Sequence, residues 1–362
     1  MRIDQCLPDF AHHDAIGNHV LQVQRLLRAE GIESDIWADV IHRPVAAHAR
    51  PYRERPRDLA GDVLMYHAST FSDMAPWLLG RAEAGQRLWS NYHNITPAKY
   101  FARWEPAVAE GQGRARAELA ALAPVTDLAL AVSAYNEQEL VEAGYTDTAT
   151  APLLVDLEEY HRPPDPAALA RLARQRDAGG TRWLFVGRLA PNKCAHDVIG
   201  AFACYRQLFD PQARLSLVGS PTSGHYLAAL GRLVAELELG DAVELPGSLP
   251  FGELLARFAM ADVFVCLSEH EGFCVPVVEA MELGLPVVAY AAAALPETVG
   301  DGGLLLADKD PLAVAVAVGD LLADPARLEL LRGAGRARAE ALSLPHTSAR
   351  FMTLVRRQLA AR

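Results

Sequence analysis

Short apolar runs rich in β-branched residues alternate along the chain with longer amphipathic stretches. This alternation is typical of strand–helix–strand units built around parallel sheets. In the first half the pattern predicts strands at 2–6, 35–38, 63–66, 88–92, 128–132 and 150–155. In the second half it predicts strands at 183–186, 215–218, 243–245, 263–266, 287–290 and 304–306. The runs are almost wholly apolar, which indicates strands covered on both faces.

Helical periodicity fills the gaps between these runs. Residues 18–29, for instance, place Val20, Val23 and Leu27 on one helix face. The last two helices are predicted at 325–341 and 345–360.

The organisation predicted is α/β, with two doubly wound parallel-sheet domains of similar size. The stretch 158–166 concentrates proline and charge without periodicity, and we interpret it as the linker. We therefore expect an N-terminal domain at 1–160 and a C-terminal domain at 161–344, with the terminal helix 345–362 a candidate to pack back on the first domain. Open parallel sheets bind ligands outside the carboxyl ends of their strands, so we expect the site in the cleft between the two domains.

Composition narrows the class of protein. The chain has 362 residues and a formal charge of -11, an acidic balance that argues against general nucleic-acid binding. Its five cysteines form no CxxC pair, which favours free thiols in a reducing cytoplasm. The first residues lack the apolar run of a signal peptide, and the apolar stretch 285–295 is shorter than the ~20 residues of a membrane span. We expect a cytoplasmic protein.

The segment after the predicted strand 263–266 carries candidate chemistry. Glu271 and Gly272 precede Pro276, which fits the first turn of a helix. The free N–H groups at such a helix start bind anions. Glu271 and Glu279 flank this start and suit a ligand with a phosphate between two sets of hydroxyls, as in a nucleotide-sugar. The alternative is that these carboxylates are solvated charges.

A second candidate follows the predicted strand 183–186. Arg188 comes directly after the strand and Lys193 five residues later, and Lys193 is one of only three lysines in the chain. Two cations on a strand-exit loop can neutralise a leaving diphosphate; a surface ion pair is the alternative. No motif for a metal site is present, and the adjacent His12, His13 and Asp14 are a weak candidate for one.

These motifs together carry a family resemblance. VGRLAPNK at 186–193, combined with EGFCVPVVE at 271–279, resembles the retaining glycosyltransferases of family 4, which have the GT-B fold of two facing Rossmann-like domains. YHNITPAKYF at 92–101 and VSAYNEQEL at 132–140 are also similar to that family. The resemblance covers nearly the whole chain.

The resemblance implies a donor site in the second domain. Arg188 and Lys193 would bind the diphosphate, and Glu279 the ribose hydroxyls. Glu271 would hold the donor sugar and its phosphate together with four backbone amides, those of Gly272, Phe273, Cys274 and Val275. Leu249 would lie beside the base.

In the first domain the resemblance implies roles for Gly17 and His93. Gly17 would sit on the loop after the first strand, where the backbone approaches the diphosphate, and His93 would lie near the transferred sugar. Two departures from the family pattern are visible: Ile16 precedes Gly17 where a second glycine is usual, and Cys194 follows Lys193 where glycine is common. For His93 and for His67 the alternative is a structural histidine at a strand end.

The function implied is a retaining hexosyltransferase that needs no metal or other cofactor. It would move a hexose from GDP-mannose or a UDP-sugar to a hydroxyl of a saccharide, glycolipid or small molecule, in polysaccharide or glycolipid assembly. His93, Glu271, Arg188 and Lys193 would be its catalytic residues, with His93 orienting the sugar. Two alternatives stay open: a nucleotide-sugar hydrolase or epimerase on the same fold, and a non-catalytic nucleotide-sugar-binding protein. The nearest match to a dinucleotide-binding GxGxxG motif, at 111–116, follows no predicted strand.

The stretch 50–57 is rich in arginine and proline. Contact with anionic lipid headgroups at the inner membrane surface is one interpretation of this stretch, and a solvated loop is the other.

Overall fold

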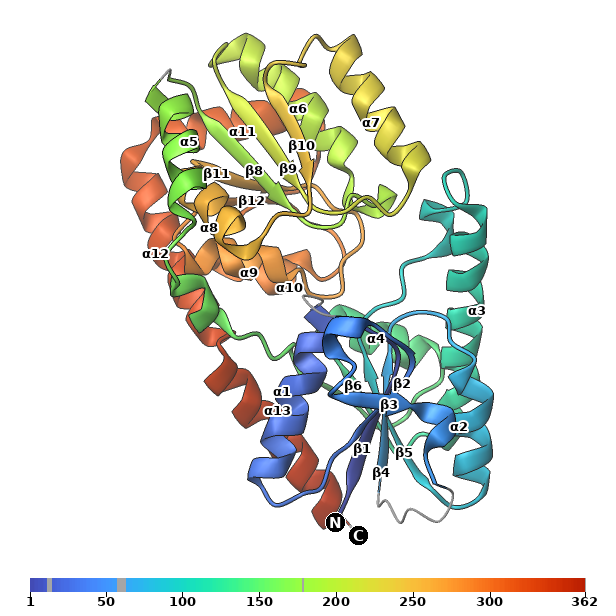
Figure 1. The fold of residues 1–362 in the computed structure, drawn as a ribbon. Helices are drawn as coiled ribbons and strands as arrows, with labels where there is room; N and C mark the ends of the chain where they lie inside the picture. The colour runs from blue at the N-terminus through green and yellow to red at the C-terminus, as the bar shows by residue number, and fades with distance from the viewer. Residues whose placement is uncertain (12–14, 57–62, 178, 362) are drawn as a thin grey trace. The chain divides into compact units, whose positions relative to one another are not determined.

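The computed structural model describes residues 1–11, 15–56, 63–177 and 179–361, and the chain divides into two compact units. Unit 1 comprises Met1–Ala102, Pro106–Val155 and Ser343–Arg362. Unit 2 comprises Arg103–Glu105 and Asp156–Leu342. Figure 1 shows that each unit is built around its own sheet with helices packed against it. In the described part of the chain, no helix has the length and apolar character needed to cross a membrane.

The sheet of unit 1 has seven parallel strands in the order β3-β2-β1-β4-β5-β6-β7. Their bounds are β1 Ile3–Phe10, β2 Ile36–Ile41, β3 Ala49–Pro51, β4 Val63–Ala68, β5 Arg87–Tyr92, β6 Leu128–Ala131 and β7 Thr148–Thr150. The helices of this unit are α1 Ala15–Ala29, α2 Met74–Glu83, α3 Pro106–Leu122, α4 Ala134–Glu142 and α13 Leu344–Ala360. Short 3-10 helices lie at η1 Arg43–Val45, η2 Tyr52–Glu54, η3 Ala98–Tyr100 and η4 Ala123–Val125.

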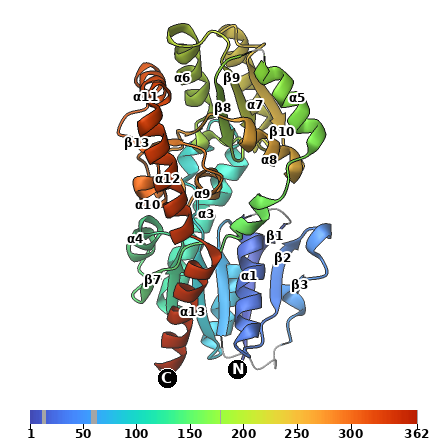
Figure 2. The same cartoon turned by 90° about the vertical axis from the view of Figure 1, so that its left-hand side faces the viewer.

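Alternate residues of these strands build a core on each face of the sheet. On one face, Ile3, Trp89 and Leu130 pack with residues of α1 and α13, and Figure 2 shows those two helices on the same side. On the other face, residues of β4, β5 and β6 pack with α2, α3 and α4. The near-continuous apolar runs in the sequence therefore reflect strands buried on both sides.

The sheet of unit 2 has six parallel strands in the order β10-β9-β8-β11-β12-β13. Their bounds are β8 Arg182–Val186, β9 Arg214–Val218, β10 Val243–Gly247, β11 Val263–Cys266, β12 Val287–Tyr290 and β13 Leu304–Leu306. The helices are α5 Pro166–Asp177, α6 Ala195–Leu208, α7 Gly224–Glu236, α8 Phe251–Met260, α9 Val275–Glu282, α10 Leu295–Val299, α11 Pro311–Ala323 and α12 Pro325–Ala341. The 3-10 helices are η5 Leu157–His161, η6 Pro191–Lys193 and η7 Gly300–Gly302.

Both sheets have the strand order of a doubly wound fold, with a point where the order reverses. In unit 1 that point lies between β1 and β4, and in unit 2 it lies between β8 and β11. Ligands of such sheets bind outside the carboxyl ends of the strands at this point. The fold therefore singles out the loops after β1 and β4, and those after β8 and β11.

The predicted strands are present, and the largest differences in their bounds, at β1 and β7, have physical reasons. β7 ends at Thr150, because Pro152 has no N–H to continue the ladder that an apolar run at 150–155 predicted. Leu154 N–H donates instead to His19 Nδ1, at 3.0 Å. β1 continues to Phe10 although Pro8 lies within it, since beyond Cys6 it pairs with β2 alone.

The prediction that 50–57 is a solvated loop is wrong for its described part. Residues 49–51 form the edge strand β3, whose partly polar, exposed side chains give no apolar signal. Arg55 follows η2 and is buried, with its Nη2 2.8 Å from Asp4 Oδ2. Arg55 is therefore part of an internal ion pair and does not present its charge to a lipid surface. Arg57 lies outside the described residues.

Apart from residues 103–105, the chain passes from unit 1 to unit 2 between Val155 and Asp156 and returns between Leu342 and Ser343. The terminal helix α13 therefore belongs to unit 1, whereas α12 belongs to unit 2. α13 contributes Phe351, fully buried, to the core on the α1 face. Arg356 on the same helix binds Glu30 at 2.6 Å.

We predict that Phe351→Ala destabilises unit 1 by about 3–5 kcal/mol, because it removes an aromatic ring from a close-packed core. Arg350→Ala, at the exposed position directly before Phe351, should change stability by no more than about 0.5 kcal/mol. Urea unfolding followed by tryptophan fluorescence measures both variants. A wild-type midpoint for Phe351→Ala would contradict a role for α13 in this core.

Candidate functional site

The carboxyl ends of β8 and β11 carry a cation and a carboxylate that meet. The two strands pair in parallel, with Phe264 opposite Leu184. Lys193 ends η6 in the loop after β8, and Glu271 lies in the loop after β11. Lys193 Nζ donates a hydrogen bond to Glu271 Oε2, and the two form an ion pair. Glu271 is 6% exposed, so its charge is balanced mainly by the lysine.

Backbone and amide hydrogen bonds hold these two loops together. The N–H of Glu269 donates to the carbonyl oxygen of Asn192 at 2.9 Å. In return, Asn192 Nδ2 donates to the carbonyl oxygen of His270, also at 2.9 Å. Asn192 is buried, so its contacts are shielded from water. These hydrogen bonds therefore fix the two loops that carry Lys193 and Glu271.

The start of α9 lies directly after Glu271. Gly272, Phe273 and Cys274 lead into the helix, and Cys274 has a left-handed backbone with φ of 74°. Thr298 Oγ1 donates to the carbonyl oxygen of Phe273 at 2.5 Å and so fixes the loop. The first N–H groups of an α-helix have no partner within the helix, and the helix dipole adds positive potential. The segment from Gly272 to Val275 can therefore bind an anion.

Glu279 is the second candidate carboxylate, and it is buried on α9. Tyr160 Oη, from η5, donates to Glu279 Oε1. Burial raises the pKa of Glu279 to about 7, and the hydrogen bond from Tyr160 opposes that rise. The Tyr160 ring packs against Phe251 of α8, with ring centroids 5.1 Å apart. Tyr160 lies in the segment that the sequence indicated as a linker, so its role as a partner of Glu279 was missed.

The remaining predicted residues of unit 2 lie on neighbouring strand-exit loops. Arg188 follows β8 and is exposed, and Leu249 is half-buried between β10 and α8. The loop after β9 packs on the loop after β8: a Cβ on Gly219 would lie 1.9 Å from the carbonyl oxygen of Gly187. Glycine at 219 therefore permits an approach that no other residue allows.

A further charged cluster, centred on Lys309, was missed by sequence reasoning. Lys309 Nζ lies 2.5 Å from Asp197 Oδ2 and 2.6 Å from Glu269 Oε1. Burial lowers the pKa of Lys309, but the hydrogen bonds to both carboxylates outweigh burial and the pKa is raised. Lys309 Nζ also lies 3.4 Å from Cys194 Sγ. The backbone of Cys194 has a φ of 52°, a conformation that glycine adopts most readily. The only feature of the sequence that could have pointed to Lys309 is the rarity of lysine in this chain.

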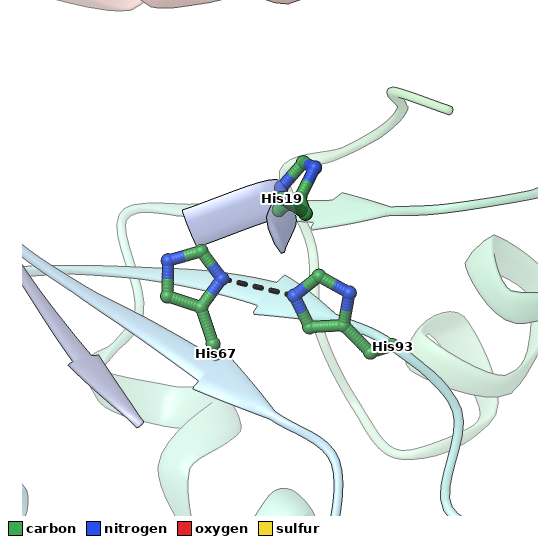
Figure 3. Close-up of side chains that lie close together, drawn as sticks. All are labelled: His19, His67 and His93. Carbon is green, nitrogen blue, oxygen red and sulfur yellow. Dashed lines mark hydrogen bonds between the residues drawn. The ribbon is translucent and has the colours of Figure 1, made fainter. Parts of the chain in front are cut away.

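In unit 1, His93 lies just after β5 and is 8% exposed. His93 Nε2 is 2.9 Å from His67 Nδ1, and His67 Nε2 is 3.0 Å from Gln5 Oε1. His19, on α1, lies beside both rings, as Figure 3 shows. His67 thus has both ring nitrogens in hydrogen bonds, as expected for a structural histidine. Sequence reasoning missed His19 and Gln5.

Gly17 lies in the first turn of α1, and the prediction that it belongs to the loop after β1 is wrong. A Cβ at Gly17 would lie 2.5 Å from the carbonyl oxygen of Ala11. The absence of a side chain therefore allows the end of β1 to approach the helix start. The weak metal candidate His12, His13 and Asp14 lies outside the described residues.

Three groups of side chains in the described residues have metal-ligand spacing: His19 with His67 and His93, Cys194 with His196 and Asp197, and Cys266 with Glu271 and Cys274. In the last two groups the carboxylate already pairs with a lysine ammonium. Burial is the main cause that raises the pKa of Cys194, to about 12, and hydrogen bonding to Cys266 is the main cause that raises that of Cys274. The raised pKa of Cys194 disfavours the thiolate that a metal requires, whereas in the other group the hydrogen bond with Cys274 lowers the pKa of Cys266.

Comparison with known proteins identifies similar chains. The family model described as glycosyl transferases group 1 matches residues 173–338, which include β8 to β13. A GDP-mannose-dependent alpha-(1-6)-phosphatidylinositol monomannoside mannosyltransferase of Mycolicibacterium smegmatis is 35% identical over 61% of this chain. That match spans about three fifths of the relative's own length, 60%.

Two further matches extend along nearly the whole chain. A D-inositol 3-phosphate glycosyltransferase of Frankia alni is 30% identical over 88% of this chain and 89% of its own length. The structure of sucrose-phosphate synthase from Thermosynechococcus elongatus superposes with a TM-score of 0.77 at 23% identity, covering 100% of both chains. The structural likeness shows that the fold of two Rossmann-like domains is shared.

The pKa of Glu279 predicts a pH dependence of stability. In the folded state the Glu279 carboxyl keeps its proton up to about pH 7. In the unfolded chain its pKa has the ordinary value of 4.5. The folded state therefore binds more protons between these values, and stability falls as pH rises from 4.5 to about 7. The loss is about 3 kcal/mol at about 1.4 kcal/mol per pKa unit.

Glu279→Gln should remove this loss and gain stability relative to the wild type between pH 5 and pH 8. Tyr160→Phe should move the loss to higher pH, since it deletes the hydrogen bond that opposes the pKa rise. Thermal unfolding of the three proteins at both pH values measures this. An equal difference between Glu279→Gln and wild type at the two pH values would show that Glu279 is not the group responsible.

Proposed function

The chain belongs to the glycosyl transferases group 1 family, and from that premise we propose that it transfers a hexose from a nucleoside-diphosphate sugar to a hydroxyl acceptor. The observation that carries this proposal is the Lys193–Glu271 pair beside the start of α9, at the point where the strand order of the second sheet reverses. A cation, a carboxylate and a helix start within adjoining loops match the alternating anionic and hydroxyl groups of such a donor.

In this proposal unit 2 holds the donor. Arg188, Lys193 and the N–H groups at the start of α9 bind the diphosphate. Glu271 holds the sugar hydroxyls and, before the donor arrives, keeps the Lys193 ammonium in position. Glu279 accepts hydrogen bonds from the ribose hydroxyls, and Leu249 lies beside the base.

The reaction proposed retains the configuration at the anomeric carbon and uses no metal ion. The bond from the anomeric carbon to the diphosphate oxygen breaks, and both electrons leave with the diphosphate. Arg188, Lys193 and the start of α9 stabilise that charge. The acceptor oxygen attacks the same face of the oxocarbenium-like sugar, and its proton passes to the departing phosphate oxygen. No carboxylate is assigned as a covalent nucleophile, and His93 orients the sugar.

The relatives' names indicate the substrate classes to test. The Mycolicibacterium relative is named for GDP-mannose, and we propose GDP-mannose as the donor, with a UDP-sugar as the second candidate. Both relatives are named for acceptors that contain inositol and phosphate. A polyol phosphate or glycolipid hydroxyl is therefore the acceptor class that we favour.

Thermal-shift measurements with UDP-, GDP- and ADP-sugars, each with and without EDTA, test the donor. A ligand bound only by the native state raises its stability, by about 2.7 kcal/mol at a concentration of a hundred times Kd. We expect one base to give a clear shift that EDTA does not remove. Mass spectrometry of reactions with polyol phosphate and glycolipid acceptors then measures transfer.

The same reactions without acceptor separate the alternatives. Rapid release or epimerisation of the sugar from the donor alone would favour a hydrolase or epimerase. Binding without any turnover across the acceptor panel would favour a non-catalytic binding protein. Transfer that requires added magnesium would contradict the metal-free mechanism.

We predict that Lys193→Ala lowers the transfer rate about a hundredfold or more, because one preorganised charge donor contributes about 3–4 kcal/mol to a transition state. Lys99→Ala, an exposed lysine of unit 1, is the matched control and should retain the wild-type rate. The thermal midpoint of Lys193→Ala is measured alongside, since Glu271 loses its partner. An unchanged rate in a folded variant would contradict the diphosphate assignment.

A further inference from the structure

Three imidazole rings lie together at the carboxyl end of the first sheet (Figure 3). His19 comes from α1, His67 from β4, and His93 follows β5. The His67 and His93 rings are nearly parallel, at 18°, with ring centroids 5.2 Å apart, and a nitrogen of each faces the other ring. All three side chains are buried, two of them completely.

Burial keeps the three rings neutral. It lowers the pKa of His19 to about 3 and lowers the pKa of His67 and His93 well below 6.5. A neutral imidazole carries one proton, so one ring nitrogen donates and the other accepts. The hydrogen-bond partners then decide which nitrogen is protonated in each ring.

Gln5 fixes the tautomer of His67. Gln5 Nε2 donates to the backbone carbonyl oxygen of Val20 at 3.1 Å, and a carbonyl can only accept. The amide orientation of Gln5 is thereby set, and its Oε1 faces His67 Nε2 at 3.0 Å. His67 Nε2 must therefore carry the proton, and His67 Nδ1 is left with a free lone pair.

His67 in turn fixes the tautomer of His93. The bare Nδ1 of His67 lies 2.9 Å from His93 Nε2, so His93 Nε2 must be the protonated donor. His93 Nδ1 then has a lone pair. That atom is buried and has no hydrogen-bond partner among the residues that the structure describes. A buried acceptor without a partner is costly, which marks the position as one that a ligand donor completes.

We propose that Gln5 and His67 are positioning residues that hold His93 in the Nε2-protonated tautomer, so that His93 Nδ1 accepts a hydrogen bond from a sugar hydroxyl; this rests on the proposed transferase function. The relay runs from the Gln5 carbonyl through His67 to His93, and each step uses a hydrogen bond of 2.9–3.0 Å. The site accepts a hydroxyl donor and rejects an acceptor group such as a carbonyl oxygen at the same place.

The position of His19 argues against a metal ion shared by the three rings. His19 Nδ1 accepts the backbone N–H of Leu154 at 3.0 Å, so the proton of this ring is on Nε2. His19 Nε2 faces the Asn91 side-chain amide at 2.9 Å. The Nε2 proton needs an acceptor, and Asn91 provides one if its side-chain amide is turned so that Oδ1 faces the ring. Asn91 Oδ1 otherwise has no partner in the described structure. Neither nitrogen of His19 therefore offers a lone pair to a metal.

Long-range proton–nitrogen correlation spectra of ¹⁵N-histidine-labelled protein test the relay directly, because protonated and bare ring nitrogens resonate far apart. The expected result is a protonated Nε2 and a bare Nδ1 in both His67 and His93, with signals assigned from His67→Asn and His93→Asn. In Gln5→Leu, His67 loses its acceptor and the protons of both rings should redistribute. Gln24→Leu is the matched control: Gln24 is also a buried glutamine bonded to a backbone carbonyl, that of Ser34, at 2.9 Å.

Kinetics test the positioning role. His67→Leu should lower kcat/KM for transfer about tenfold through lost orientation of His93, and His67→Asn should restore most of it, because its amide oxygen can accept from His93 Nε2. The affinity for the nucleoside diphosphate without sugar should stay within about twofold of the wild type in both variants, whereas a general loss of structure would lower it together with the thermal midpoint.

Three outcomes would overturn the relay. The first is a protonated Nδ1 on His93 in the wild-type spectrum, and the second is a stoichiometric transition metal in the purified protein that His67→Asn releases. The third is an unchanged kcat/KM in His67→Leu although the His93 tautomer has changed. The spectra need no substrate. If the protein transfers no sugar, the proposed function is wrong, but the spectra still determine the tautomers of His67 and His93.

Discussion

The pairing of β8 with β11 is the constraint on which the candidate donor site depends. These strands are neighbours although another pair of strands, β9 and β10, lies between them in the sequence. Their adjacency brings Lys193 and Glu271, 78 residues apart, into one ion pair. Without this adjacency Glu271 would lose its cation, and a buried carboxylate that loses its partner is strongly destabilising. The charge pair and the topology therefore support each other.

Near that pair, lysine side chains of unit 2 form ion pairs with neighbouring carboxylates. Lys193 offsets Glu271, and Lys309 offsets Asp197 in the first turn of α6 and Glu269 in the loop after β11. Among the described residues Glu279 forms no ion pair; burial raises its pKa, and the Tyr160 hydroxyl donates a hydrogen bond to it. A buried carboxylate that is half protonated near neutral pH can either donate or accept a hydrogen bond. This suits a partner with vicinal hydroxyls, which offers both donors and acceptors.

Much of the fold and part of the site were predictable from the sequence, because short stretches of sequence carry the signals for them. Strands such as 263–266 and 287–290 are buried on both faces, so their apolar runs mark them at the observed bounds. Lys193 and Glu271 were recognisable because each lies in the loop that follows such a strand. The short strand β3 was missed because an edge strand needs no apolar face.

The partners of the site residues were not predictable, because strand order and helix placement decide them. Tyr160 reaches Glu279 from 119 residues away, and Gln5 reaches His67 from 62. Neither tyrosine nor glutamine forms part of a spacing motif with its partner. Gly17 was assigned to the wrong element because the predicted helix began at residue 18, whereas the described helix α1 already includes residues 15–17.

The two units differ in the kind of chemistry they can supply. Unit 2 presents charged groups, whereas the buried His67 and His93 of unit 1 are neutral and poor bases, since burial lowers their pKa values well below 6.5. A general base works best with a pKa near the operating pH, so His93 is unsuited to remove a proton from an acceptor hydroxyl. The proton must then leave with another group, and the departing phosphate oxygen, which gains negative charge as the sugar bond breaks, is the base that the proposed reaction itself creates. A neutral His93 that accepts a hydrogen bond from the sugar through Nδ1 is therefore compatible with the retaining, base-free transfer that we propose.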